Sequence, residues 1–219
     1  ETLSYDEQMY WRSFNVPPRG SISAVAYKRG FLAEATDPER PDLYFKLAME
    51  RFFTAWTKRF GWPLFLPLSG DDAHHFTSLR IPLTNEQREF DEQVLSLTKL
   101  LIDSLNEEEI KRALPPGALK GDERGIAKFA CFLAEKGYDD AEGDVRFLRD
   151  LQELRSSGTA HRKGGNYDKV AARLGLQDRQ MARGFERLLG RATRLLSNLE
   201  SQLIDGKDEP EVAKLEPTD

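Results

Sequence analysis

The stretch of the chain that decides the fold lies near its C-terminal end, at residues 181–203, and reads MARGFERLLGRATRLLSNLESQL. Its apolar side chains recur every three or four residues, which places them on one face of an α-helix. The members of this stripe are Met181, Phe185, Leu188, Ala192, Leu195, Leu199 and Leu203. We therefore expect a long amphipathic helix over about 178–204, whose stripe must be buried against other helices.

Four segments upstream show the same helical periodicity. They are residues 41–60, 84–105, 122–136 and 141–155, and a further short helix is expected at 167–174. The chain does not contain several segments of alternating β-branched residues, which are typical of strands. The sequence therefore predicts an all-α fold, an antiparallel helical bundle over residues 41–204.

Proline, glycine and capping residues mark where these helices begin and end. The first helix is expected to follow Asp37 and Pro38, a cap residue and a proline at the first helical position. Residues Thr84–Gln87 fit a capping box for the second helix, which is expected to pause at Asn106. The prolines within residues 61–67 block a helix. This aromatic segment is therefore either a hydrophobic strap across the bundle or an exposed docking segment.

The two ends of the chain lack a helical period. Residues 1–40 contain the breaker-rich run Asn15–Gly20 and are expected to form an irregular segment or linker. Residues 205–219 are acidic and include two prolines, which predicts a disordered tail. Because the first residue is Glu1 rather than Met, we expect either a processed chain or a piece of a longer parent chain with further domains.

Composition excludes several classes of protein. The 219 residues include 13 Phe, 6 Tyr and 3 Trp, enough aromatic material for a core, so wholesale disorder is excluded. A single cysteine, Cys131, excludes a disulfide framework and a four-cysteine metal site. The chain has no apolar run of membrane-spanning length, and its acidic start does not resemble a signal peptide. We expect a cytoplasmic protein with no membrane partner.

Charge is unevenly distributed along the chain. The formal net charge is −5, yet residues 146–194 contain twelve basic and five acidic residues, a formal charge of +7. A basic segment inside an acidic protein is typical of a local site for a polyanion such as RNA. The alternative is that these charges only solvate the exposed faces of helices.

The sharpest candidate site is the sequence RSSGTAH at residues 155–161. The helix ending there fixes Arg155, and the following Ser-Ser-Gly can turn the chain so that His161 lies near it. Histidine can move a proton near neutral pH, and arginine matches phosphate oxygens bidentately. Such a pair can support cleavage of RNA by its own 2′-hydroxyl, with His161 helping to move the proton and Arg155 stabilising the developing charge. This chemistry needs no metal, so no cofactor is expected.

Basic residues and glycines follow the pair directly. Arg162 and Lys163 can hold a phosphate, and the adjacent glycines allow a backbone to approach one. Together with Lys169 and Arg173 on the next expected helix, they are the candidate RNA-binding residues.

The motif from Leu151 through Arg155 to His161, placed within a helical bundle, resembles the HEPN superfamily, whose signature is an arginine followed after four to six residues by a histidine. The resemblance covers roughly residues 84–204. It implies a compact helical domain that dimerises so that two Arg/His pairs meet in one cleft. Many members are metal-independent ribonucleases of prokaryotic defence or toxin-type systems.

Carried over to this sequence, the resemblance makes Arg155 and His161 the catalytic pair, RNA the substrate and a homodimer the expected assembly. The long apolar stripes also suggest more apolar surface than one small bundle needs. Several HEPN domains lack nuclease activity. A catalytically inactive helical module for dimerisation or regulation of a larger protein therefore remains the alternative.

One further cluster has side chains that can bind a metal. Asp71, Asp72, His74 and His75 supply two carboxylates and two imidazoles, which suit zinc or manganese. Adjacent histidines project differently from any regular backbone, and no partner cluster is present elsewhere in the sequence. The weaker interpretation is a metal site here, and the stronger is a polar loop with helix-capping acids.

Overall fold

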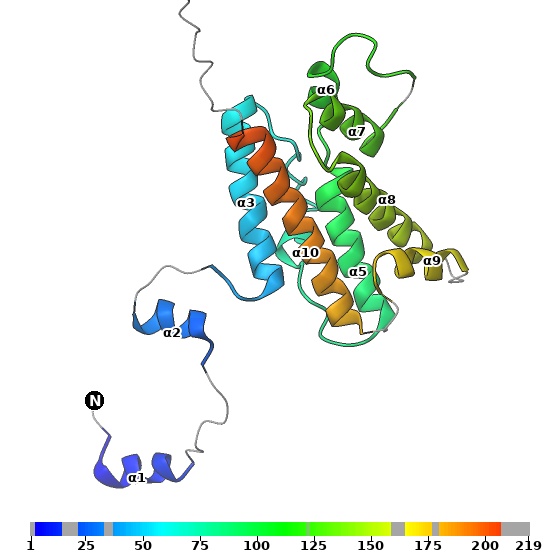
Figure 1. The fold of residues 1–219 in the computed structure, drawn as a ribbon. Helices are drawn as coiled ribbons and strands as arrows, with labels where there is room; N and C mark the ends of the chain where they lie inside the picture. Colours follow the sequence, from blue (N-terminus) through cyan, green and yellow to red (C-terminus); the bar gives the residue numbers. More distant parts are fainter. Residues whose placement is uncertain are drawn as a thin grey trace, which may run out of the picture. The chain divides into compact units, whose positions relative to one another are not determined.

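The computed structural model describes residues 3–14, 22–32, 37–121, 123–158, 165–176 and 180–206. The chain divides into two compact units, Glu1–Pro38 and Glu39–Asp219. Over the described residues its regular structure consists of helices (Figure 1). The one addition within these residues is an isolated β-bridge. The predicted all-α class is therefore confirmed. None of the helices in these described ranges combines the length and apolar character that crossing a membrane requires.

The larger unit contains eight of the described α-helices and two π-helical segments. They are α3 (Pro41–Phe60), α4 (His74–Thr77), α5 (Gln87–Thr98), η1 (Lys99–Asp103), α6 (Glu107–Arg112), α7 (Ile126–Glu135), α8 (Ala141–Gly158), α9 (Gly165–Arg173), α10 (Met181–Leu199) and η2 (Glu200–Asp205). Helix α10 packs against both α3 and α5, and α8 packs against α5, α7 and α9 (Figure 1). The bundle is thus one continuous sequence of packed helices.

The stripe of residues 181–203 forms the centre of the core. All of its members from Phe185 to Leu203 are buried, and Met181 at its start is half-buried. Helix α3 has the bounds that its periodicity predicts, and it presents Phe45, Phe52 and Trp56 to the same core. Burial of these side chains is the main force that holds the bundle together.

Two helix starts differ from the prediction. The proline at the first position of α3 is Pro41, not Pro38, and Arg40 before it holds the buried carboxylate of Asp42 with contacts of 2.7 and 3.2 Å. Helix α5 begins at Gln87 without the capping box expected from Thr84. The Thr84 hydroxyl instead donates to Glu89, one turn into the helix, at 2.7 Å.

The segment after α3 is a strap across the bundle. Leu64 and Phe65 are buried, and Phe65 forms the isolated bridge with Leu105. The backbone N–H of Asn106 donates to the Leu64 carbonyl at 2.9 Å, and its side chain accepts from the backbone at the start of α6. The strap interpretation and the expected pause at Asn106 are both confirmed.

The smaller unit is more ordered than its sequence suggests. It contains α1 (Tyr5–Ser13) and α2 (Ala24–Phe31), so the expected irregular segment includes two short helices. Ser4 and Glu7 form a capping box at the start of α1, a local signal that lies outside the breaker-rich run. Residues 207–219, most of the predicted disordered tail, lie outside the described residues.

Candidate functional site

The candidate site is built around Arg155 in the last turn of α8, which continues as a helix to Gly158, so the turn expected at Ser-Ser-Gly is not formed. Leu151 and Leu154 of the same helix are buried, which fixes the rotation of α8 about its axis and directs Arg155 outward. The Arg155 side chain is 31% exposed. Its Nη1 donates to both carboxylate oxygens of Asp103, at 3.0 and 2.8 Å. The guanidinium is therefore held in one orientation at the edge of solvent.

Asp103 reaches Arg155 because η1 is wound as a π-helix. The N–H of Ser104 donates to the carbonyl of Lys99, five residues earlier, at 3.1 Å. The wider turn buries three consecutive apolar side chains, Leu100 to Ile102, and leaves Asp103 facing α8. Single π-turns of this kind are frequent at functional sites.

The other end of η1 is tied to the Asp72 cluster. Lys99 Nζ donates to Asp72 at 3.0 Å, and Asp72 lies 3.7 Å from the buried imidazole of His75. The Nδ1 atom of His75 lies 3.0 Å from Ser96 Oγ. Burial lowers the pKa of His75, which favours its neutral form. One π-turn thus anchors two candidate clusters that are far apart in the sequence.

The described residues do not assemble the alternative metal site. His74 faces the backbone carbonyl of Asp71 at 2.7 Å, and His75 faces Ser96. No group of three or more metal-binding side chains occurs in the ranges that the structure describes. The polar-loop interpretation fits these contacts, since Asp72 and His75 fasten α4 to α5 and η1.

The structure places only some of the predicted RNA-binding residues. His161, Arg162 and Lys163 lie outside the described residues. Lys169 is exposed on α9. Arg173 on the same helix donates to the buried Asp150 at 2.7 Å and also pairs with Glu153, so that it joins α9 to α8.

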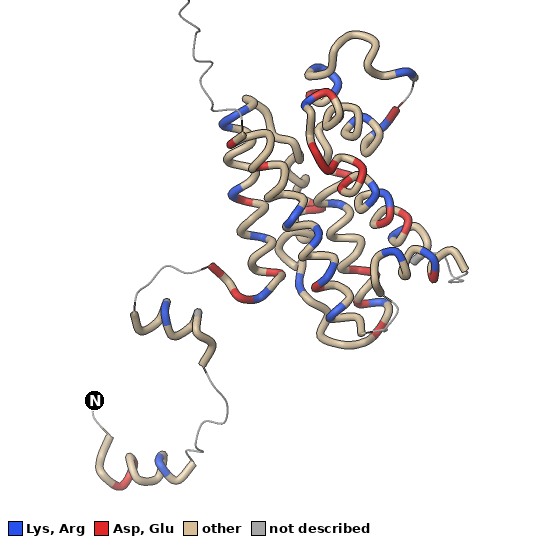
Figure 2. The backbone as a smooth tube through the Cα atoms, viewed as in Figure 1, with Lys and Arg blue, Asp and Glu red and all other residues tan. Residues whose placement is uncertain are grey.

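Basic and acidic residues are mixed along α8 (Figure 2). Arg146 pairs with Glu142 one turn away, and Arg191 of α10 lies 4.7 Å from the ring of Phe147. Several cations of the basic window therefore have structural partners. This arrangement agrees with the solvated-face interpretation for that part of the window.

Sequence reasoning missed Asp103 as a member of the site. It lies 52 residues before Arg155, so no local pattern connects the two. The one available signal was that Leu100 and Ile102 are apolar although they lie outside the helical period of the other apolar residues in segment 84–105.

Comparison with models of known families, with curated proteins and with solved structures finds no match to this chain.

Proposed function

We propose that the larger unit is a metal-independent, RNA-cleaving domain of the HEPN type, acting in a prokaryotic defence or toxin-type system. The observation that carries the proposal is the placement of Arg155. It lies in the last turn of the amphipathic helix α8, six residues before His161 in the sequence, and Asp103 holds its guanidinium at the edge of solvent. A planar, oriented guanidinium suits a phosphate that gains charge in the transition state.

The proposed reaction is an internal transfer within the RNA strand. The 2′-hydroxyl loses its proton, its oxygen bonds to the adjacent phosphorus, and the bond from phosphorus to the 5′-oxygen breaks. His161 moves the proton, and Arg155 stabilises the charge on the phosphorane. The products are a 2′,3′-cyclic phosphate and a 5′-hydroxyl, and no oxidant or added water is needed.

The deciding experiment is incubation of single-stranded RNA with the full chain in EDTA. We expect cleavage to products that end in 2′,3′-cyclic phosphate, while DNA of the same sequence remains intact. His161→Ala is expected to abolish cleavage and spare RNA binding. Arg155→Ala is expected to lose cleavage and some affinity, and Arg155→Lys to recover little, because an ammonium lacks the planar fork of donors. Equal cleavage by wild type and His161→Ala would contradict the proposal.

The second candidate function is a catalytically inactive module for dimerisation or regulation. The pairing of Arg155 with Asp103, and of Arg173 with Asp150 and Glu153, favours it, because such pairs also serve packing alone. A chain that forms dimers but leaves RNA intact under all the conditions above would support this module.

A further inference from the structure

Two adjoining cavities extend from the candidate site along the larger unit. The first, of about 550 Å³, lies between the end of η1, the start of α7 and the exposed side of α8. Its lining includes Asp103, Glu107, Arg124, Arg149 and Gln152. Because Asp103 is the ion-pair partner of Arg155, the wall of this cavity lies next to the proposed catalytic arginine.

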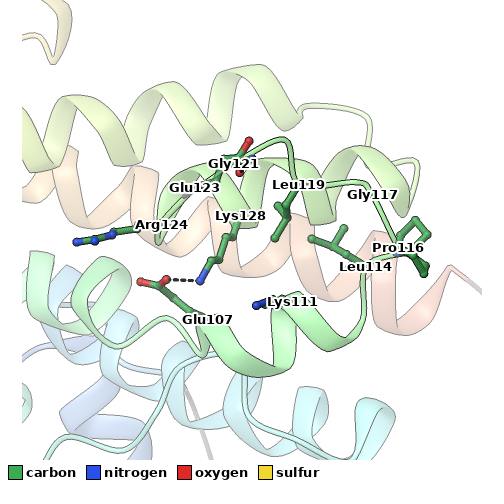
Figure 3. Close-up of a pocket in the computed structure, with 11 residues that line it drawn as sticks. Glu107, Lys111, Leu114, Pro116, Gly117, Leu119, Gly121, Glu123, Arg124 and Lys128 are labelled. Carbon is green, nitrogen blue, oxygen red and sulfur yellow. Dashed lines mark hydrogen bonds and ion pairs between the residues drawn. The ribbon is translucent and has the colours of Figure 1, made fainter.

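The second cavity, of about 580 Å³, continues from the first. The two share Glu107 and Arg124 in their walls. The second lies between α6, α7 and the loop that joins them, and Lys111 and Lys128 line it (Figure 3). In Figure 3 Arg124 and Lys111 lie on opposite sides of the ion pair between Glu107 and Lys128. Basic side chains therefore follow one another along both cavities.

The acids of the first cavity are matched by other cations. Asp103 is paired with Arg155, and Glu107 is paired with Lys128 at 2.8 Å. Arg124 and Arg149 are both exposed and add positive charge to this wall. The two acids and two arginines that line the first cavity sum to zero, and the partners of the acids, Arg155 and Lys128, lie outside this lining and bring the charge of the whole set to +2.

Glu123, the acid that lines only the second cavity, binds the backbone of its own loop. Glu123 accepts hydrogen bonds from the backbone N–H groups of Lys120 and Gly121, at 3.0 and 2.9 Å. The backbone N–H of Glu123 itself, together with those of Lys120 and Gly121, lowers the pKa of Glu123, which favours its ionised form in this loop. Lys111 is exposed in the same wall. An anionic ligand thus meets basic side chains along the length of both cavities.

We propose that these cavities form a strand-binding groove, in which Arg149 and Arg124 contact successive phosphates of the RNA that reaches Arg155. The inference rests on the proposed function and names how its substrate is held. Arg149 precedes Arg155 by six residues, which is about 9 Å along a helix axis. A row of cations at such intervals suits a polyanionic strand better than a single small anion.

The test measures how tightly the full chain binds RNA. The readout is the fluorescence anisotropy of a 5′-labelled, single-stranded RNA 16-mer in EDTA. The variant Arg124→Gln/Arg149→Gln removes two exposed cations from the groove. The control Arg59→Gln/Arg146→Gln removes the same charge from exposed positions on α3 and α8 that line neither cavity. Circular dichroism of all forms verifies that they fold alike.

We expect the groove variant to bind this RNA about tenfold or more weakly than the control. Loss of two phosphate contacts should also reduce the slope of log K against log salt by about 1.4, at about 0.7 per contact on a single strand. Equal affinity and equal salt slope for the groove variant and the control would overturn the groove. So would the absence of RNA binding at low salt.

A competition arm separates a strand from a free nucleotide. If AMP displaces the 16-mer from wild type at micromolar concentration, the groove is a small-nucleotide site and the strand assignment is overturned. Failure of AMP to compete supports the strand.

Cleavage in the same samples separates the two proposals. If RNA binds through Arg124 and Arg149 but stays intact, the proposed groove is supported and the proposed nuclease activity is rejected. If wild type and the groove variant bind and cleave the RNA equally well, the proposed nuclease activity is supported and the proposed groove is rejected.

Discussion

At the scale of single residues, Asp103 has a positioning role that differs from the role of Arg155. Both of its oxygens contact the same guanidinium nitrogen, Nη1, so the carboxylate fixes where that nitrogen lies. The pair is about one-third exposed on each side, and such a pair contributes about 1 kcal/mol or less to stability. Its importance, under the proposed function, lies in orientation.

We therefore predict that Asp103→Asn lowers kcat for RNA cleavage by about tenfold to a hundredfold, because small misplacements of a catalytic group are costly. The affinity for RNA should be unchanged or higher, since a negative charge is removed. Single-turnover kinetics and anisotropy measure the two effects separately, and Asp103→Glu should recover part of kcat. A wild-type kcat in Asp103→Asn would show that Asp103 only helps packing.

A second residue-scale prediction concerns Glu89. Backbone N–H groups of Leu83 and Thr84, the Thr84 hydroxyl and Arg80 all donate to its carboxylate. These bonds lower the pKa of Glu89 from 4.5 to about 2. Because the folded state holds the charged form, the stabilisation is complete above pH 4.5 and is lost as the pH falls toward 2.

Glu89→Gln should accordingly be less stable than wild type at pH 6, and the difference should shrink as the pH approaches 2. Urea unfolding at several pH values between 2 and 6 measures it. Glu92→Gln, on the same helix with a more exposed ion pair, serves as the matched control. A difference between wild type and Glu89→Gln that stays constant over this range would refute the assignment.

At the scale of helices, α3 depends on Trp56. Its ring is completely buried. The distances from its ring centroid to those of Phe52, Phe60, Trp62 and Phe132 are between 4.4 and 6.1 Å. The Nε1 atom is buried without a hydrogen-bond partner among the described residues. The side chain thus stabilises the fold through apolar contact.

Trp56→Ala should lower the free energy of unfolding by about 3–5 kcal/mol, because it leaves a cavity in the core. Trp56→Phe should cost less than about 1.5 kcal/mol, since an aromatic ring is kept and an unpartnered N–H is removed. Urea denaturation compares the two variants. Equal losses would mean that the indole N–H is hydrogen-bonded in the folded protein.

The helices show which parts of a fold a sequence can predict. The bounds of α3 and the stripes of α8 and α10 follow from contiguous apolar periods, which are a local property. The π-turn and the contact of Asp103 with Arg155 depend on packing between distant segments, so no local rule identifies them. The start of α5 was missed for a similar reason, because Thr84 meets Glu89 in a loop network in place of the expected cap.

At the scale of the whole molecule, the apolar stripes no longer require a second copy of the chain. The stripes of α5 and α10 are buried within one chain, with Phe90, Leu97, Phe185 and Leu195 at 1% exposure or less. The apolar surface of these stripes therefore gives no support for a homodimer. The remaining argument is the expected meeting of two Arg/His pairs in one cleft.

We predict on that remaining ground that the chain is a homodimer with Arg155 and His161 near the two-fold axis. Light scattering at micromolar concentrations should report twice the mass of one chain. Arg155→Glu, which replaces the ion pair with Asp103 by two adjacent acids on each side of such an axis, should shift the equilibrium toward monomer, whereas Arg146→Glu should not. A single-chain mass for wild type throughout the concentration range would reject the dimer.

The π-turn η1 has a consequence for insertions and deletions. If Lys99–Asp103 kept its five residues but relaxed to an α-helix, which advances by about 100° per residue and so by more than a π-turn, the residues at the end of the turn and after it would rotate about the helix axis. Asp103 would then leave Arg155 even though both residues were still present. At this point of the chain, the number of residues matters as much as their identity. A homologous sequence one residue shorter here would bring its acid to the same face with an ordinary α-helical turn.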